Sequence, residues 1–304
     1  MIPVTGQAQD EIRYLVPDVE TLAQRLAAVD YLIDEALATS MFLSLRLPQP
    51  LLLEGEAGVG KTEAGKSLAA VLDTPLIRLQ CYDGIDAAEA LYEWNYPRQL
   101  LSIRLADARG TELREEDLFG RDYLIRRPLL SALEHPGPRP AVLLVDEIDR
   151  ADDDFEAFLL ELLAEAAVTI PEIGTIRATH PPIIVLTSNR TRDLHDAVKR
   201  RCLYQWIDYP SVQREVEIVR RRVPGASQTL AVQVADAISR MRESDVQKPP
   251  GVAEAIDWVA ALTVLGVVEL DAAAIDRTLG SVLKYAEDQE VVRAAGLERL
   301  AGRP

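Results

Sequence analysis

The chain has 304 residues, of which 48% are hydrophobic and 27% are charged, and its net charge is -16. That length can bury the core of one large domain or of two smaller ones. No uncharged apolar run reaches the roughly eighteen residues that a membrane-spanning helix needs, so we expect no transmembrane segment. Proteins that grip nucleic acid normally show a basic face, so the acidic balance favours protein or small-molecule partners and argues against nucleic acid.

The N-terminus and the cysteines indicate a cytoplasmic protein. The first residues, MIPVTGQAQDEIRYL, lack the basic and apolar regions of a secretory signal peptide. Cys81 and Cys202 lie far apart without CxxC spacing, and we interpret both as buried thiols in a reducing compartment. The three histidines, His135, His180 and His195, have no metal-ligand spacing and predict no metal site.

The predicted elements begin with one helix over residues 19–46, whose apolar residues recur at helical spacing until two prolines end it. Apolar runs separated by helical patterns then follow, and such runs are typical of a parallel sheet covered on both faces. The runs are LLLE from residue 51, LIRLQ from 76, AVLLVD from 141, IIVLTS from 183 and LYQWIDY from 203.

Two segments interrupt this pattern, and a third region ends it. Residues 82–127 make a long connection between the second and third predicted strands, and residues 168–180 predict a β-hairpin with its turn near Gly174. Beyond the fifth strand the pattern is purely helical. We therefore expect an α/β domain over residues 1–210, with an insert within about 82–127, and a small all-α domain over residues 211–304.

A glycine-rich motif follows the first predicted strand. Residues 55–62, GEAGVGKT, match G-x-x-x-x-G-K-[ST] in full, with a strand before and a helix after. Glycines let the backbone curl so that its N–H groups point at phosphate oxygens, and the helix N-terminus favours the same anion. Lys61 can reach the β and γ phosphates, and the Thr62 hydroxyl can bind Mg²⁺. The motif predicts an ATP site, rather than a chance turn, built from Gly55, Glu56, Ala57, Gly58, Val59, Gly60, Lys61, Thr62 and Glu63.

Two carboxylates follow the third predicted strand, AVLLVDE. Ligands of an open parallel sheet lie beyond the carboxyl ends of its strands, so we expect Asp146 to hold Mg²⁺ and Glu147 to polarise the attacking water. A solvated acidic turn is the competing interpretation. The fourth strand ends in TSNR, and Asn189 is the candidate for contact with the γ-phosphate or the water, although Asn is also common in plain turns.

Together these motifs and the helical C-terminal part resemble the AAA+ ATPases. The run DEIDRADDDFEAFLLELLAEAAVTI is similar to the MoxR family, with Asp149 where those proteins usually have Asn. Within that family, YEWNYPRQLL and VKRRCLYQWIDYPS resemble the CoxD-type members linked to maturation of molybdenum-containing carbon monoxide dehydrogenase. The resemblance covers nearly the whole chain. It implies a P-loop three-layer αβα sandwich with a parallel five-stranded sheet, followed by an all-α lid domain.

The resemblance also implies site residues that lie outside the two motifs. In LHDAVKRRC, Arg201 is the expected arginine finger that reaches into a neighbouring subunit, with Arg200 close behind; a solvated basic cluster is the alternative. Arg150 matches an arginine placed at a subunit interface. MoxR proteins usually open a lid helix with S-P-R, but this chain reads QKPPGVAEAIDW, with Glu254 near the place of that arginine. Either the arginine that senses the nucleotide is missing, or Lys248 or another residue substitutes for it.

The expected function is therefore Mg²⁺-dependent ATP hydrolysis by a homo-oligomer, a hexameric ring, that remodels a partner protein during metalloenzyme maturation. The implied partners are a client metalloenzyme subunit and a von Willebrand factor A-type protein. Trp94, Tyr96 and Phe119 in the insert either grip the client or pack on their own domain, and Cys81 has a sulfur-handling role as the alternative to a buried thiol. The competing functions are a nucleotide-dependent switch with little turnover, a nucleic-acid motor and a small-molecule kinase.

Overall fold

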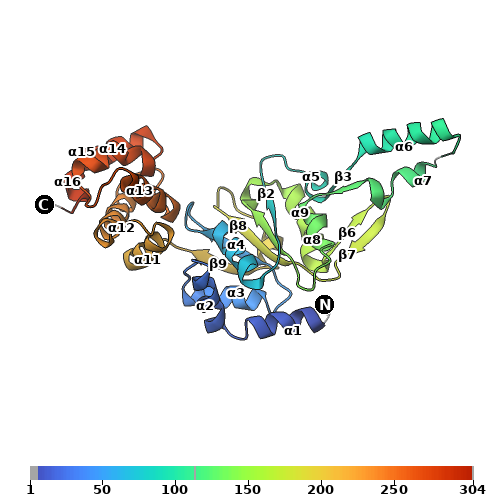
Figure 1. Cartoon of the computed structure of the whole chain (residues 1–304), viewed down its shortest axis with the longest axis horizontal. Coiled ribbons are helices and arrows are strands. Elements are labelled where there is room, and N and C mark those ends of the chain that lie inside the picture. Colours follow the sequence, from blue (N-terminus) through green and yellow to red (C-terminus); the bar gives the residue numbers. More distant parts are fainter. Residues whose placement is uncertain (1–5, 113, 303–304) are drawn as a thin grey trace. The chain divides into compact units, whose positions relative to one another are not determined.

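A computed structural model describes residues 6–112 and 114–302 of the chain. Its internal contacts divide the chain into two compact units, and each unit is assembled from separate stretches of sequence (Figure 1). The first, here the sheet unit, takes in Met1–Arg25, Asp34–Glu54 and Ala64–Gln205. The second, here the helical unit, takes in Leu26–Ile33, Gly55–Glu63 and Trp206–Pro304. The expected domain boundary at residue 210 stays a prediction.

The main sheet has five strands in the order β2-β5-β8-β1-β9, and the pairs β2–β5, β5–β8 and β8–β1 are parallel. The predicted parallel five-stranded sheet is thus confirmed, with every strand on its predicted apolar run. In sheet order the strands are Leu76–Gln80, Val142–Asp146, Ile183–Ser188, Leu51–Gly55 and Leu203–Ile207. Two antiparallel pairs complete the strands: β3 (Tyr92–Trp94) with β4 (Leu124–Arg126), and β6 (Ala167–Ile170) with β7 (Gly174–Arg177).

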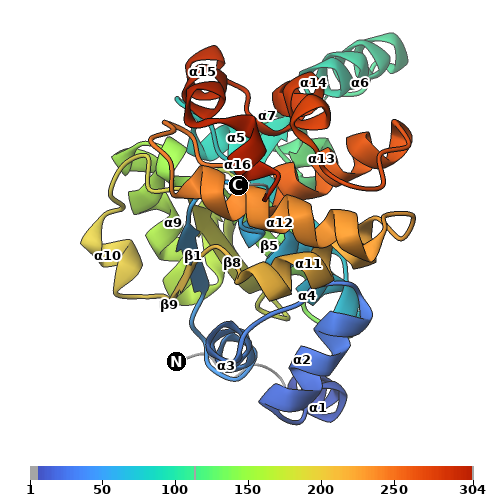
Figure 2. The same ribbon diagram turned by 90° about the vertical axis from the view of Figure 1, so that its left-hand side faces the viewer.

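Helices lie on both sides of the main sheet (Figure 2). The α-helices up to β9 are α1 (Gly6–Leu15), α2 (Val19–Ala28), α3 (Glu35–Ser44), α4 (Lys61–Leu72), α5 (Ala87–Leu91), α6 (Tyr96–Arg109), α7 (Glu115–Leu118), α8 (Pro128–Leu133), α9 (Asp153–Glu165) and α10 (Asp196–Lys199). There are also two 3₁₀ turns: η1 (Arg121–Tyr123) lies between α7 and β4, and η2 (Ile148–Arg150) lies between β5 and α9.

Strand β5 shows how the two faces are covered, because successive residues of a strand point to opposite sides. Leu143 and Val145 belong to a buried cluster with residues of α8 and with Leu159 of α9. Leu144 instead faces α4, where a Cβ added to Gly65 would lie 3.1 Å from its Cδ1. Both faces of β5 are therefore buried, and its polar residues appear only where the strand ends.

The single helix predicted over residues 19–46 is wrong. The chain leaves α2 at Ala28, and Asp30 has a φ of 61°, in the left-handed region that ends a right-handed helix. A new N-cap then starts α3, because the Asp34 side chain accepts a 2.7 Å hydrogen bond from the backbone N–H of Leu37. The apolar spacing continued across this break and concealed it.

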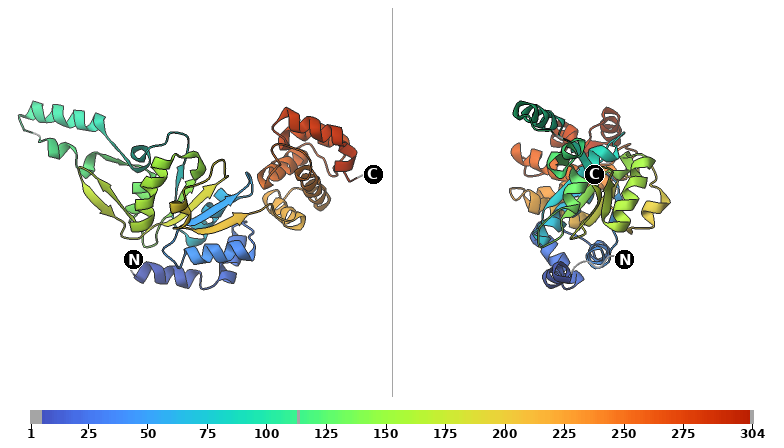
Figure 3. Two further views of the ribbon diagram at one scale, coloured as in Figure 1. Left: turned by 180° about the vertical axis from the view of Figure 1, so that it is seen from behind. Right: turned by 90° about the vertical axis from the view of Figure 1, so that its right-hand side faces the viewer.

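The connection between β2 and β5 forms an arm that ends in α6 (Figure 3). Trp94 on β3 is buried and meets the Phe119 ring edge-on, with 5.2 Å between the ring centroids. These two aromatic residues therefore pack on their own domain, which was one of the two predicted alternatives. Tyr96 at the start of α6 is 60% exposed. The hairpin predicted over residues 168–180 is confirmed as β6–β7, with Gly174 at the start of β7.

The helical unit has its own hydrophobic core. Trp258 is fully buried and its indole N–H donates a 2.7 Å hydrogen bond to Thr278. Arg242 makes two bonds, of 2.7 and 2.8 Å, to the buried carboxylate of Glu215. Its later helices are α11 (Val212–Arg222), α12 (Gln228–Arg242), α13 (Val252–Val264), α14 (Ala272–Val282), α15 (Ala286–Ala295) and α16 (Leu297–Leu300). In the described part of the chain, no helix has the length and apolar content to cross a bilayer.

Candidate nucleotide-binding and hydrolysis site

The predicted phosphate loop lies in the helical unit and joins the end of β1 to the start of α4. Gly58 and Gly60 have φ values of +76° and +97°, which side-chain-bearing residues rarely adopt, and these angles curl the loop. The Lys61 ammonium donates to the carbonyl oxygens of Gly55 (2.8 Å) and Glu56 (2.6 Å). The cation is therefore held inside its own loop, where the loop N–H groups would also bind a phosphate.

The first turn of α13 packs directly on this loop. The N–H groups of Val252 and Ala253 donate to the Gly58 carbonyl at 3.0 and 3.3 Å. A Cβ on Gly251 would lie 2.7 Å from both the Ala57 oxygen and the Gly58 Cα, so only glycine fits there. The phosphate loop and the first turn of α13 both belong to the helical unit.

Glu254 lies in the same turn, at the place where the resemblance predicted a missing arginine. Its Oε2 accepts the Gly251 N–H at 2.9 Å and would lie 2.8 Å from a Cβ on Gly58. The backbone N–H of Lys248, the predicted substitute, donates to Asp288 at 3.2 Å. Helix α13 itself contains no Lys or Arg. The first turn of α13 therefore offers the phosphate loop a carboxylate and no cation.

Asp146, at the end of β5, is held from both neighbouring strands of the sheet unit. Its carboxylate is 1% exposed and accepts Arg78 of β2 at 3.0 and 2.5 Å. The Thr187 hydroxyl of β8 donates to its other oxygen at 2.5 Å. Burial of a carboxylate is costly unless it is hydrogen-bonded in this way. Asp146 is thus an oriented oxygen ligand of the kind that Mg²⁺ prefers.

Glu147 follows directly, with a φ of 56° that turns it out of the strand. Its N–H donates to Thr187 at 2.9 Å, and its carboxylate accepts Gln80 at 3.1 Å and pairs with Arg150 at 3.0 Å. A non-glycine residue in the left-handed region is costly and is often found at functional sites. Both predicted carboxylates therefore meet at the carboxyl end of β5, and Arg150 contacts Glu147 within its own subunit.

The remaining predicted residues follow β8 in the chain. Asn189 comes directly after the last residue of β8, which lies between β5 and β1 in the sheet. Arg200 ends α10, and the Arg201 guanidinium donates to the Ala197 carbonyl at 3.1 Å. Both arginines are exposed, as a cation that reaches a neighbouring subunit must be. Their catalytic roles stay predictions.

Three site residues were missed by sequence reasoning: Arg78, Gln80 and Thr187. Each belongs to a strand that flanks β5, and Gln80 stands opposite Asp146 in the register. A signal was present, since Arg78 and Gln80 are polar residues on alternate positions of an otherwise apolar strand, LIRLQ. The strand order that brings them to Asp146 could not be deduced from that spacing.

The two thiols are poor nucleophiles in this structure. Burial, and after it the nearby carboxylates of Asp146, Asp149 and Glu147, raise the pKa of Cys81 from 9.0 to about 12. Burial alone raises the pKa of Cys202 to about 12. Within the described residues, no group of three or more His, Cys, Asp or Glu side chains is arranged to hold a metal ion.

Comparison with known proteins decides the family. The family described as "AAA domain (dynein-related subfamily)" matches residues 50–202, half of the chain. The chain belongs to this family. The match begins just before β1 and ends after Arg201, so this AAA domain contains the phosphate loop and both carboxylates. The resemblance to AAA+ ATPases of the MoxR type is confirmed at this level, and the CoxD-type branch stays a prediction.

Several curated proteins are similar to this AAA protein. The denitrification regulatory protein NirQ of Pseudomonas aeruginosa is 25% identical over 209 residues, which cover 66% of this chain and 70% of NirQ. Protein NorQ of Paracoccus denitrificans is 27% identical over 268 residues, 83% of this chain and 85% of NorQ. Among solved structures, a RuvB variant of Thermotoga maritima aligns with 94% of this chain and 83% of its own, at 16% identity and a TM-score of 0.47.

Proposed function

We propose that this AAA protein is a Mg²⁺-dependent ATPase that forms a ring, expected to be hexameric, and remodels a partner protein in the cytoplasm. One observation carries the ATPase part of the proposal. At the end of β5 the Thr187 hydroxyl donates to the Asp146 carboxylate and accepts the backbone N–H of Glu147, in a chain that also has a complete phosphate loop. A switch protein that hardly turns over would have no need of the second carboxylate.

Mg²⁺–ATP is the ligand that these two motifs predict. The loop N–H groups and Lys61 would bind the β and γ phosphates, and the oxygens of Thr62 and Asp146 would hold the ion. When bound, Mg²⁺ supplies charge that stabilises the transferring phosphoryl group. The Asp146 carboxylate is held by Arg78 and by Thr187, so its oxygens are already oriented for a cation.

Glu147 is proposed to take up the proton of the attacking water, because a carboxylate next to the Mg²⁺ ligand is placed for general-base catalysis. Gln80 and Arg150 fix its carboxylate, and Asn189 would orient the water or the γ-phosphate. Arg201, or Arg200 beside it, would complete a neighbouring subunit's site with a planar cation. Each site is then shared between two subunits, which makes turnover depend on assembly.

The proposed partner is a metalloenzyme subunit whose active site is being matured, as the CoxD-type resemblance implies, together with a von Willebrand factor A-type protein. The names of the relatives support an accessory role, since NirQ is called a denitrification regulatory protein. A nucleic-acid motor is the alternative that the net charge of -16 disfavours. A small-molecule kinase would not need an arginine acting between subunits.

A pull-down from extract of the native host tests this proposal. The bait is Glu147→Gln loaded with ATP, and Lys61→Ala, which should not bind ATP, is the matched control. We expect a molybdenum-enzyme subunit or a von Willebrand factor A-type protein to be enriched on the ATP-loaded bait only. Enrichment of nucleic acid or of an unrelated metabolic enzyme instead would reject the maturation role and leave the ATPase standing.

A further inference from the structure

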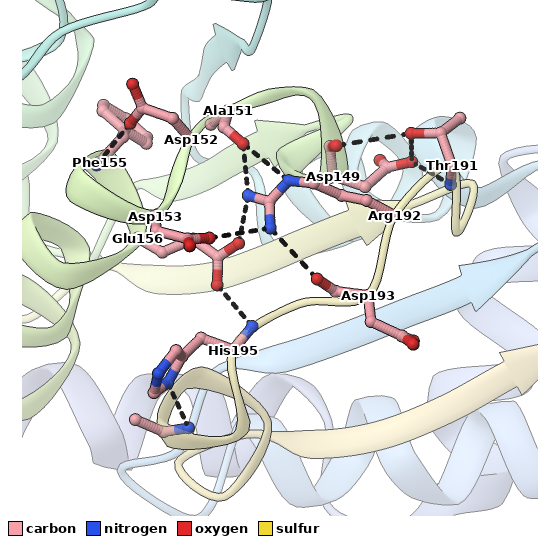
Figure 4. A network of polar contacts seen from close by, with 11 residues as sticks. Asp149, Ala151, Asp152, Asp153, Phe155, Glu156, Thr191, Arg192, Asp193 and His195 are labelled. Atoms are coloured by element: carbon pink, nitrogen blue, oxygen red, sulfur yellow. Dashed lines mark hydrogen bonds and ion pairs between the residues drawn. The ribbon is translucent and has the colours of Figure 1, made fainter.

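Hydrogen bonds join the segment between Asn189 and α10 to the segment that follows Glu147 (Figure 4). Asp149 of η2 is 2% exposed, and its Oδ2 accepts the backbone N–H of Thr191 at 2.9 Å and the Thr191 hydroxyl at 2.7 Å. All of these residues lie in the sheet unit. The loop after β8 is therefore not free to move without breaking contacts to a buried carboxylate.

Arg192 makes the next contacts of this loop. Its Nε donates to the Ala151 carbonyl at 2.9 Å, and its Nη2 donates to Ala151 and to the carboxylate of Glu156. Glu156 of α9 is 1% exposed, so its carboxylate is paired with this guanidinium away from water. Figure 4 shows Arg192 pointing toward Ala151 and Glu156. The Arg192 guanidinium thus contacts groups of its own chain, and it is not the cation that is expected to reach a neighbouring subunit.

The second oxygen of Glu156 contacts the start of α10, the helix that directly precedes the two exposed arginines. It accepts the backbone N–H of His195 at 2.8 Å. His195 is the N-cap of α10, and its Nδ1 accepts the Ala197 N–H at 3.2 Å. Arg201 donates to the carbonyl of the same Ala197 at 3.1 Å. An unbroken series of contacts therefore runs from Arg192 through Glu156 and the start of α10 to Arg201.

We propose that Arg192 and Glu156 are positioning residues that set α10, and with it Arg200 and Arg201, for contact with the nucleotide of a neighbouring subunit. This inference rests on the proposed function, in which Arg201 acts between subunits. Neither residue touches the nucleotide in this account. Their effect comes from holding α10, a helix of only four residues that cannot hold its own orientation.

The inference predicts a defect in turnover and not in nucleotide binding. Arg192→Met removes the cation but keeps an unbranched apolar chain, and Glu156→Gln keeps the size of the side chain while it removes the charge. A misplaced Arg201 should lower kcat by about tenfold to a thousandfold, because complete removal of an arginine finger lowers kcat by up to about 10⁵-fold. Binding of a fluorescent ATP analogue should change less than about threefold, because the phosphate loop is untouched.

The matched control is Arg177→Met. Arg177 pairs with Glu165 at 3.3 Å in the same unit, but both side chains are more than half exposed. Such exposed pairs contribute little to stability. We expect this variant to hydrolyse ATP at the wild-type rate. Equal losses in Arg177→Met and Arg192→Met would overturn the inference, because any lost arginine would then have the same effect.

Mixing experiments separate a misplaced finger from a general structural defect. In the reference mixture, Arg201→Ala and Glu147→Gln should together recover turnover, since a mixed ring can join one intact finger to one intact Glu147. If Arg192→Met lacks only finger delivery, turnover should return when it is mixed with Glu147→Gln and should not return with Arg201→Ala. Glu156→Gln should show the same pattern, and it serves as the test if Arg192→Met does not fold.

The opposite result would overturn the inference. If turnover recovers when Arg192→Met is mixed with Arg201→Ala, the defect lies in the nucleotide site of the Arg192→Met subunit itself. If turnover recovers with neither partner, the role of Arg192 is only structural. Failure of the reference mixture of Arg201→Ala with Glu147→Gln would reject the shared site of the proposed function, and the inference with it. If the reference mixture recovers turnover but Arg192→Met does not recover with Glu147→Gln alone, the inference is rejected and the shared site of the proposed function is kept.

Discussion

The hydroxyl of Thr187 donates a 2.5 Å hydrogen bond to Asp146 and at the same time accepts the backbone N–H of Glu147 at 2.9 Å. A single buried side chain on β8 thus orients the Asp146 carboxylate and holds the backbone from which the Glu147 side chain extends. Thr187 lies on a strand of the main sheet and not in a loop. The positions of the proposed Mg²⁺ ligand and of the proposed base are therefore set by strand pairing.

Thr187→Val tests this arrangement, because it keeps the side-chain shape and removes both hydrogen bonds. An unpaired buried donor costs about 1–3 kcal/mol, so the free energy of unfolding in urea should fall by that amount. The maximal ATPase rate should fall by about tenfold or more. Thr187→Ser, which keeps the hydroxyl, is the control. Wild-type turnover in the valine variant would show that Thr187 does not orient the two carboxylates.

Lys61→Ala should abolish ATP binding, since the ammonium held by the Gly55 and Glu56 carbonyls is the only cation that the loop motif itself contributes. Isothermal titration with ATP measures the effect. Lys66→Ala, on the exposed side of the same helix, is the control and should bind ATP as the wild type does. Tight ATP binding by Lys61→Ala would refute the phosphate-loop assignment.

Gly251→Ala should weaken ATP binding and lower the melting temperature, because the added Cβ would lie 2.7 Å from the backbone of Ala57 and Gly58. Backbone atoms cannot give way as a flexible side chain can, so the phosphate loop or the start of α13 must shift. Gly225→Ala is the matched control, since its Cβ would meet only Thr263, at 3.7 Å. Equal ATP affinity and melting temperature in the two variants would disprove the close packing of α13 on the loop.

The thiols of Cys81 and Cys202 should resist alkylation in the folded protein. With each pKa at about 12 instead of 9.0, the thiolate fraction at pH 8 falls by about 10³. Iodoacetamide labelling, read by mass spectrometry with and without urea, measures the difference. Rapid labelling of Cys81 in the native protein would contradict this and would reopen a sulfur-handling role.

The same pKa shifts set a direction for stability against pH. The unfolded thiols ionise near pH 9.0, whereas the folded ones stay protonated up to about pH 12. Unfolding therefore releases protons in this window, and the contribution to stability is complete below pH 9 and is lost as the pH rises toward 12. Cys81→Ser should change the slope of the unfolding free energy between pH 9 and 11 and leave it unchanged below pH 8.

The parts of the fold that depend on contiguous residues could be predicted from the sequence. The apolar strands and the loop from Gly55 to Thr62 are of this kind, since each carries its own pattern. The break in the first predicted helix was missed because a left-handed Asp30 leaves no mark on apolar spacing. The contacts that orient the site join distant residues, such as Arg78 with Asp146 and Glu156 with Arg192. They depend on strand order and loop path, which local patterns do not specify.

The proposed role of Glu147 as the base in ATP hydrolysis is tested most directly by the identity of the nucleotide that remains bound after incubation with Mg²⁺ and ATP. The wild type and Glu147→Gln are compared by ion-exchange chromatography. We expect ADP on the wild type and intact ATP on Glu147→Gln, at similar occupancy. ADP on both proteins, formed at similar rates, would contradict the assignment of Glu147.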